Sequence, residues 1–209
     1  NRNGYGNFNQ RTGQCQGLNS YLRCPYAAST PAHFIIEKEM KNLRMSRCIN
    51  HAVTGVNTFT SMASALRKAL SKSYGKVEGV APQFELAQWL QLPTKLGIYP
   101  SQICEIGLNT GMSAIAWLCA FPQAHYLSFD IMRYNASLFA RDWLTMAFPG
   151  RLQLSAGDTM ETLRPKKLEL VGRRCTVISI DGGHSVPFAI NDLNGMMKIA
   201  ADKHMVIMD

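Results

Sequence analysis

Short apolar runs alternate with amphipathic stretches of helical length through the second half of the chain. Five of these runs have the length and the aliphatic and aromatic content of buried strands. They read ICEIG, HYLSFD, LQLSAGD, CTVISIDGG and HMVIMD. Stretches of helical length such as MSAIAWLCAF and ASLFARDWLTMAF separate them. This alternation predicts an α/β fold with a doubly wound parallel sheet and helices on both faces.

The first half of the chain has a different pattern. Residues 1–29 are rich in Asn, Gly and Gln without a sustained period, which predicts an irregular arm. A helix is predicted to begin at Thr30 and Pro31, and apolar residues four positions apart predict further helices before residue 98. We therefore divide the chain into three parts: an irregular arm at 1–29, a helical cap at 30–98 and a sheet-containing core at 99–209.

An acidic residue closes, or lies beside the end of, each predicted strand. These residues are Glu105, Asp130, Asp158, Asp181 and Asp209. Ligands of doubly wound sheets bind at the carboxyl ends of the strands. Because a carboxylate there costs desolvation unless something binds it, the repetition indicates a ligand site. For Asp158 alone, capping of the following helix is an equally good explanation.

The segment ICEIGLNTGMSA at residues 103–114 joins the first predicted strand to a helix and carries Gly107 and Gly111. It lacks the Lys-Ser/Thr of a phosphate-binding loop and the GxGxxG spacing of a dinucleotide site. Such a turn suits a ligand with a carboxylate and a ribose but no pyrophosphate. Asp130, at the end of the second strand, can accept both hydroxyls of a ribose. S-adenosylmethionine (SAM) has these groups.

Five stretches resemble successive motifs of class I SAM-dependent methyltransferases: CEIGLNTGMSA, YLSFD, FPGRLQLSAGDTMETL, VISIDGGHSVPFAINDL and VIMD. In particular they resemble the O-methyltransferases related to the catechol, caffeoyl-CoA and macrocin enzymes, with their DGGH motif. The resemblance covers about residues 75–209 and implies a Rossmann-like SAM-binding core. Residues 1–70 resemble nothing in this family.

The resemblance also implies a position for each cofactor-binding residue. It places around the methionine end of SAM the residues Glu105, Gly107, Asn109, Gly111 and Ser113. It implies that Asp130 holds the ribose and that Gly157 and Asp158 lie beside the adenine. The segment GKVEGV at 75–80 is similar to the segment that closes over the cofactor. The alternative for Gly111 is that it only permits close helix packing, and the alternative for Ser113 is that it is only a small residue of the helix.

Three residues are candidates for the chemical step. In related cation-dependent enzymes, carboxylates after the fourth and fifth strands bind a divalent metal such as Mg²⁺, and Asp181 and Asp209 match two of those positions. His184 is a candidate general base for a hydroxyl proton. A hydrogen bond from His184 to the DGG turn is the equally good alternative. The resemblance thus implies O-methylation of a small molecule or a sugar hydroxyl, with Asp181 and His184 as catalytic residues.

The net charge of +8 and the pI near 9.3 favour an acidic partner or nucleic acid, although solvated basic helix faces explain the same charge. The second hypothesis is therefore a non-catalytic methyltransferase-like subunit with a structural or RNA-associated role. It would act in a homo-oligomer or a larger assembly. No apolar run in the sequence has the length of a membrane span. Lumen of the secretory pathway, cytoplasm and organelle all stay open as locations.

The six cysteines do not suggest one disulfide framework. Cys104, Cys119 and Cys175 lie in or beside apolar segments and are predicted to be buried thiols. Cys15 and Cys24 are candidates for closing a short loop in an oxidising compartment. The sequence has no CxxC pair, which argues against a structural zinc site.

The last predicted strand, HMVIMD, would leave a long apolar edge on a five-stranded sheet. Natural proteins cover such edges because their unpaired amides and carbonyls invite association. The family resembled here has seven strands. We therefore expect further strands, either from a continuation of the chain beyond Asp209 or from another chain.

Overall fold

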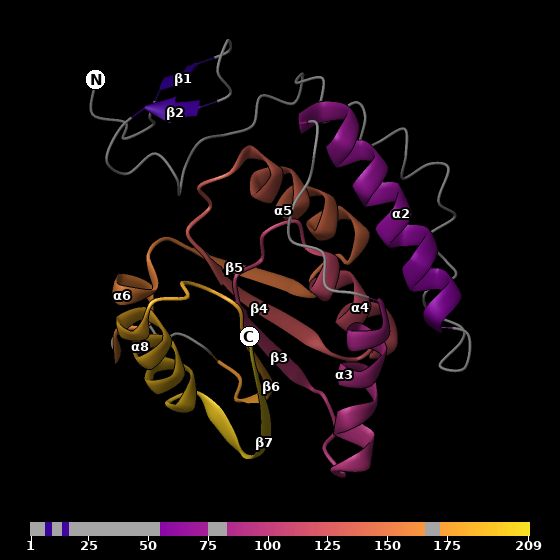
Figure 1. The fold of residues 1–209 in the computed structure, drawn as a ribbon, viewed down its shortest axis with the longest axis vertical. Helices are drawn as coiled ribbons and strands as arrows, with labels where there is room; N and C mark the ends of the chain where they lie inside the picture. Colours follow the sequence, from indigo (N-terminus) through magenta and orange to yellow (C-terminus); the bar gives the residue numbers. More distant parts are fainter. Residues whose placement is uncertain (1–6, 10–13, 17–54, 75–82, 166–171) are drawn as a thin grey trace.

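A computed structural model describes residues 7–9, 14–16, 55–74, 83–165 and 172–209. The predicted helix after Thr30, the segment at 75–80 and the candidate partner Cys24 lie outside these ranges. Within the part expected to be irregular, Asn7–Asn9 (β1) pairs antiparallel with Gln14–Gln16 (β2), so this stretch forms a small two-stranded sheet (Figure 1).

A five-stranded parallel sheet is the centre of the fold, as the apolar runs predict (Figure 1). Its strands are β3 (Gln102–Ile106), β4 (His125–Asp130), β5 (Leu152–Ala156), β6 (Cys175–Ile180) and β7 (Ala200–Met208). Their order is β5-β4-β3-β6-β7, so the direction of winding reverses between β3 and β6. The predicted fold class is confirmed. In this architecture ligands bind at the carboxyl ends of the strands that flank the reversal.

Helices cover both faces of the sheet (Figure 1). One layer holds α2 (Gly55–Tyr74), α3 (Gln83–Lys95), α4 (Met112–Ala120) and α5 (Asn135–Ala147). The other holds α6 (Thr159–Thr162) and α8 (Val186–Met197). Because successive strand residues point to opposite faces, Ile103 is buried with the first layer and Cys104 with the second.

The predicted helical cap contributes directly to the sheet's core. Leu66 and Leu70 in α2 are completely buried, in the same apolar cluster as Ile115 and Trp143. Helix α2 contacts α4 and α5, and α3 contacts α4. The spacing of four between Leu66 and Leu70 is what places both side chains on the buried face of α2. Residues 55–74 are therefore part of the support of α4, the helix that follows the glycine turn.

Two further expectations concern the edge of the sheet and the absence of a membrane span. Strand β7 lies at one edge of the described sheet, and Val206 and Met208 are exposed there. A strand that covers this edge stays a prediction. In the described ranges, no helix has both the length and the apolar character that a membrane span requires.

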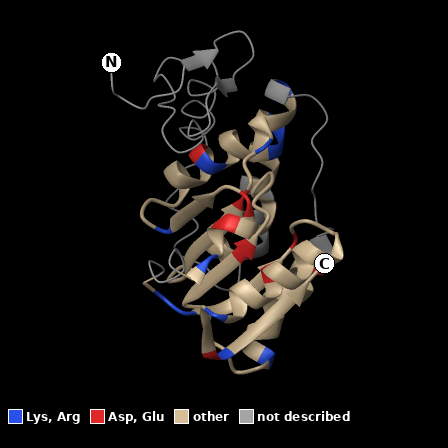
Figure 2. Cartoon of the chain, turned by 90° about the vertical axis from the view of Figure 1, so that its left-hand side faces the viewer, with Lys and Arg blue, Asp and Glu red and all other residues tan. Residues whose placement is uncertain are grey.

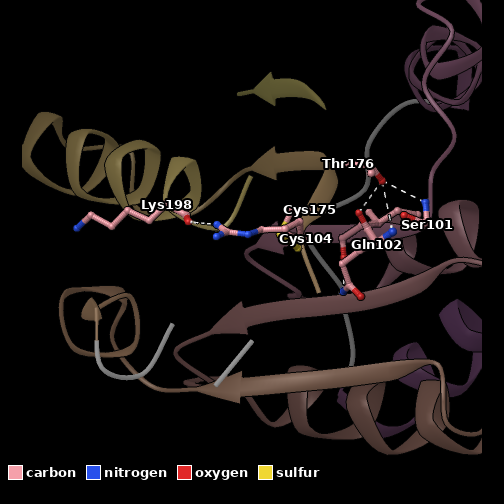
Figure 3. The surroundings of a disulfide bond; sticks show 8 residues. Ser101, Gln102, Cys104, Cys175, Thr176 and Lys198 are labelled. Atoms are coloured by element: carbon pink, nitrogen blue, oxygen red, sulfur yellow. Dashed lines mark hydrogen bonds between the residues drawn. A yellow bond between two sulfur atoms is a disulfide. The ribbon is translucent and has the colours of Figure 1, made fainter. Parts of the chain in front are cut away.

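A disulfide joins Cys104 in β3 to Cys175 at the start of β6, so the prediction of two buried thiols at these positions is wrong (Figure 3). The cause is the strand order, which makes β3 and β6 neighbours and brings the two Cα atoms within 5.7 Å. Next to the disulfide, the Thr176 hydroxyl donates to the Gln102 carbonyl oxygen at 3.0 Å. Cys119 is buried and takes no part in this disulfide, as predicted.

Removing the disulfide is expected to destabilise the fold strongly. The bond links residues 71 positions apart, and closing a loop of that length stabilises a native state by roughly 4 kcal/mol in the chain-entropy model. The Cys104→Ala/Cys175→Ala variant should therefore unfold at a lower denaturant concentration than the oxidised wild type. The measurement is equilibrium unfolding with and without a thiol reductant.

The control is Cys119→Ala, which removes another buried cysteine and leaves the disulfide in place. This control should lose as much stability as the wild type when reductant is added, whereas the double variant should lose much less. An equal response of the double variant and the wild type to reductant would show that the bond between β3 and β6 contributes nothing.

Candidate functional site

The carboxyl ends of β3, β4, β5 and β6 surround a cavity of 310 Å³. The predicted site residues in its wall are Gly107, Asn109, Asp130, Gly157, Asp158 and Asp181. Figure 2, turned by 90° from Figure 1, shows acidic residues grouped near the middle of the view. Residues that are distant in the sequence are brought together here because parallel strands end at the same edge of the sheet.

The backbone of the turn after β3 packs closely against the ends of β4 and β6. The Gly107 amide donates to the Phe129 carbonyl oxygen at 2.8 Å, and its φ is +93°. A Cβ at this position would lie 2.0 Å from the carbonyl oxygen of Asp181. Only glycine fits this position. At Gly107, between the ends of β4 and β6, the wall of the cavity is therefore backbone without a side chain.

Gly111 has a packing role. It precedes α4 as the N-cap residue, and a Cβ added to it would lie 2.6 Å from the Leu144 Cδ1 atom of α5. Its absence of a side chain lets α4 and α5 approach each other. Gly111 is not among the residues that line the cavity. These contacts support the helix-packing alternative for this glycine.

Asp130 is held rigidly at the end of β4. Its Oδ2 accepts a hydrogen bond from the Asn109 amide at 2.9 Å, and its Oδ1 accepts one from the Met132 amide at 2.5 Å. Asn109 and Met132 are the non-glycine residues with positive φ in the described part of the chain. Strain of this kind is retained where the surrounding structure requires it, often at functional sites. The carboxylate of Asp130 keeps further lone pairs for a ligand.

Glu105 and Ser113 stand behind the glycine turn and do not line the cavity. Glu105 is only 2% exposed, and the Ser113 hydroxyl donates to its Oε1. Burial raises the pKa of Glu105 to about 8, the Ser113 hydrogen bond and nearby Tyr126 lower it, and the charges of Asp181 and Asp130 raise it further. The Tyr126 hydroxyl lowers the pKa of Glu105 by its proximity and makes no hydrogen bond to it. Glu105 therefore holds a proton at neutral pH.

Asp181 lines the cavity after β6, whereas His184 lies beside Asp181 and is not among the lining residues. The His184 Nε2 atom is 3.7 Å from the Asp181 Oδ1 atom, and the two side chains are 71% and 55% exposed. Partial burial and then the negative charge of Asp209 raise the pKa of Asp181, while His184 lowers it. The Asp209 amide donates to the Ile180 carbonyl oxygen, which places Asp209 beside the end of β6. The structure thus brings together the three residues predicted for the chemical step.

The predicted metal ligands, Asp181 and Asp209, lie near each other after β6 and β7. Asp181 and Asp209 are close enough for charge repulsion to affect the pKa of Asp181, and paired carboxylates supply oxygens that a hard cation prefers. In the described ranges, no group of three or more His, Cys, Asp and Glu side chains is arranged to hold a metal ion. Two ligands fit a cation that keeps several waters, as Mg²⁺ does. Metal binding stays a prediction.

The sequence model of one protein family, described as "Methyltransferase domain", matches residues 104–209, just over half of the chain. The chain belongs to the methyltransferase domain family. The matched residues run from β3 to the end of β7 and include every wall of the cavity. No curated protein sequence matches the chain.

Solved structures share the fold of this methyltransferase domain. A Staphylococcus aureus structure has a TM-score of 0.55 and 17% identity over 70% of this chain, which spans 65% of that protein's length. The O-methyltransferase TomG of Streptomyces achromogenes, solved in complex with SAM, has a TM-score of 0.57 and 16% identity over 72% of this chain and 64% of its own. An O-methyltransferase from Bacillus cereus in complex with SAH has a TM-score of 0.54 and 16% identity, over 83% and 74%. At these identities the likeness shows the fold.

Several residues in the cavity of the methyltransferase domain were not predicted from the sequence. They include Arg133, Tyr134, Ser137, Phe188 and Asp192. Arg133 and Tyr134 follow β4 closely, so their position after Asp130 was a usable signal. Phe188 and Asp192 lie four positions apart in α8, on one face of the helix. Which face of α8 meets the cavity depends on how the helix packs, and no pattern along the chain indicates it.

Glu105 is expected to make the stability of the methyltransferase domain fall as pH rises. Its pKa is about 8 in the folded protein and 4.5 when unperturbed, so between these values the folded state holds a proton that the unfolded chain releases. The free energy of unfolding should then decrease by ~1.4 kcal/mol per pH unit in this window. The measurement is denaturant unfolding at several pH values between about 5 and 8, which lie between the two pKa values.

The matched variant is Glu105→Gln, which keeps the shape of the protonated side chain and cannot ionise. Other titrating groups act equally in both proteins, so the difference in unfolding free energy isolates Glu105. The variant should gain stability relative to the wild type as pH rises. Parallel pH profiles for the two proteins would show that Glu105 is ionised in the folded state.

Proposed function

We propose that this methyltransferase domain binds SAM in the 310 Å³ cavity and transfers its methyl group to an oxygen of a small molecule. The observation that carries the proposal is the anchored Asp130 carboxylate beside the open backbone of Gly107. A carboxylate so held is suited to the two hydroxyls of a ribose. The volume lies at the lower end of the ~300–1,000 Å³ typical of small-molecule sites.

The charge of the cavity supports a cationic ligand. Asp130, Asp158 and Asp181 lie in its wall. A sulfonium and an ammonium group are attracted by this arrangement, whereas the pyrophosphate of a dinucleotide would be repelled. The SAM and SAH complexes of proteins with the same fold support the same class of cofactor here.

When bound, SAM would supply a methyl group attached to its positively charged sulfur. The acceptor oxygen would bond to the methyl carbon in line as the carbon–sulfur bond breaks, and SAH would leave. The residues of this chain then have to fix the two reactants, exclude water and remove the hydroxyl proton. We assign the fixing of the cofactor to Asp130 and the Gly107 turn. We assign removal of the proton to His184, whose side chain is exposed and whose Nε2 atom lies 3.7 Å from the Asp181 Oδ1 atom.

The acceptor is a small molecule with a hydroxyl group, and a sugar or polyol hydroxyl is our proposal. The opening where His184 and Asp181 lie is exposed, so an acceptor can reach it from solvent. The formal charge of +8 further favours an acidic partner, such as nucleic acid or an acidic subunit of a larger assembly.

Replacing Asp130 is expected to weaken cofactor binding. The Asp130→Ala variant loses charge-assisted hydrogen bonds to the ribose, so its affinity for SAM and SAH should fall by roughly 1.5–3 kcal/mol. Isothermal titration calorimetry measures this, with circular dichroism to confirm that the variant is folded, because Asp130 also anchors two backbone amides. Asp202→Ala is the control, since it removes an exposed carboxylate from β7.

An unchanged affinity in Asp130→Ala would remove the ribose assignment. If the wild type itself gave no binding heat with either ligand, the proposed SAM-dependent activity would be wrong, and the non-catalytic alternative would be favoured.

A divalent cation is expected to bind at Asp181 and Asp209 independently of the cofactor. Titration with Mn²⁺, followed by its paramagnetic resonance signal, should show a site that Asp181→Asn and Asp209→Asn weaken and that the control Asp202→Asn leaves intact. SAH affinity should be the same with and without chelator, because neither the Asp130 carboxylate nor the Gly107 turn needs a metal. Mn²⁺ binding of equal strength in all variants would refute the assignment of these two ligands.

A further inference from the structure

A second cavity lies at the opposite end of the sheet, where the strands begin. Its volume is 160 Å³, and its wall is formed by the amino ends of β3, β4 and β5 and by the segment just before β6. We call it the amino-end cavity. None of its lining residues lines the cavity at the carboxyl ends of the strands. The two cavities are therefore separate sites.

The register of the strands places four lining residues of the amino-end cavity on one face of the sheet. Gln102 in β3 lies opposite His125 in β4, and Leu127 in β4 lies opposite Gln153 in β5. His125 and Leu127 are two positions apart, so all four side chains point to the same face. Leu127 is buried there, whereas His125 is half-buried and Gln153 is exposed. A ligand can therefore reach the polar side chains from solvent.

Two glycines leave open space beside these side chains. Gly150 and Gly172 both line the amino-end cavity and are exposed, and a Cβ added to either would have no atom within 4 Å. The volume is below the ~300–1,000 Å³ typical of sites for whole small molecules. The amino-end cavity therefore suits an ion or a single polar group of a larger ligand.

The amino-end cavity is positively charged. Arg151 and Arg173 lie in its wall, and no Asp or Glu is among its lining residues in the described ranges. The Arg151 guanidinium is fixed in place, because its Nε donates to the Ala124 carbonyl oxygen at 2.9 Å and its Nη2 to the Phe121 carbonyl oxygen at 2.7 Å. Arg173 is exposed, and its side chain has no hydrogen bond or ion pair with the described residues. Its guanidinium is therefore available to a ligand.

His125 lies within the electrostatic influence of both arginines. Partial burial lowers the pKa of its imidazole, the positive charges of Arg173 and Arg151 lower it further, and the nearby backbone of Gly150 raises it. The ring is therefore mostly neutral at pH 7. An anion bound beside it would oppose the two positive charges and raise the pKa of His125.

We propose that the amino-end cavity is a second ligand site, which binds a tetrahedral oxyanion such as phosphate, either free or as the ester group of a small molecule. The exposed Arg173 guanidinium donates to two oxygens of the anion, a geometry that matches its planar fork. Arg151 contributes fixed positive charge, and His125 and Gln153 supply further donors. The site goes beyond the proposed methyl transfer and does not depend on it.

The dimensions of the amino-end cavity favour a small anion over a nucleic acid. A single strand binds along an extended basic groove with exposed aromatic side chains on which its bases stack. The aromatic residue in this wall, Tyr126, is only 1% exposed. One oxyanion needs neither a long groove nor an aromatic surface.

The test is a titration of the protein with inorganic phosphate, followed by the NMR signals of the His125 ring at constant pH and ionic strength. The signals are identified by their loss in His125→Gln. They should shift saturably with phosphate and not with chloride, and the pKa of His125 should rise when phosphate is bound. Arg173→Gln should weaken phosphate binding roughly 5-fold or more, because it removes a charge-assisted pair of hydrogen bonds.

Arg174→Gln is the matched control. It removes the same charge one residue away, but Arg174 does not line the amino-end cavity, and its Nη1 donates to the Lys198 carbonyl oxygen at 2.5 Å. This variant should keep the wild-type affinity for phosphate. Equal weakening in Arg173→Gln and Arg174→Gln, or a shift that chloride reproduces, would show a general effect of charge and overturn the proposal.

Two further ligands identify the source of the anion. Glycerol phosphate that binds more tightly than inorganic phosphate would support a phosphate ester as the ligand, and the reverse would support the free ion. A single-stranded oligonucleotide that binds while both small anions fail to bind would overturn the proposal in favour of nucleic acid. No cofactor is present in any of these titrations, so their outcome is independent of the proposed SAM binding.

Circular dichroism shows whether each variant is folded. Should Arg173→Gln fail to fold, the other proteins decide. A saturable shift in the wild type that Arg174→Gln keeps and chloride does not reproduce would support the proposal, and the absence of a saturable shift in the wild type would overturn it.

Discussion

The close approach of β3 to its two neighbouring strands at Gly107 governs the geometry of the site. The Gly107 amide bonds to the carbonyl oxygen of Phe129 in β4, and its Cα lies against the carbonyl oxygen of Asp181 after β6. Any side chain there would push the strand ends apart. Because the three strands end together, Asp130 and Asp181 lie on either side of one turn and face one cavity.

The strand that carries this turn is held on both sides. Strand β3 pairs with β4 on one side and with β6 on the other, and the disulfide between Cys104 and Cys175 adds a covalent link to β6 (Figure 3). Helix α4, which continues from the turn, is buried beneath α2 and α5. A ligand site built on such a support keeps its geometry without the ligand, which lowers the cost of binding.

The electrostatics of the site oppose those of the whole chain. The protein has a formal charge of +8, yet acidic groups collect around the cavity. Burial, and to a smaller extent their mutual repulsion, raises the pKa of Glu105 to about 8 and raises the pKa of Asp181. A cationic ligand would relieve that repulsion. In the proposed SAM site and at the proposed pair of metal ligands, these acidic residues would attract a cation.

The sequence by itself determined the strands, the helices of the core and the acidic residues at the strand ends, because hydrophobic period and glycine turns are local properties. Asp130 and Gly107 could be predicted for the same reason. Only the tertiary structure decided that Cys104 and Cys175 form a disulfide, because the order of strands in the sheet cannot be predicted from any single segment. It also decided which face of α8 brings Asp192 to the cavity and how deeply Glu105 is buried. Pairings, helix rotation and burial depend on packing between distant segments, and a pattern along the chain does not contain them.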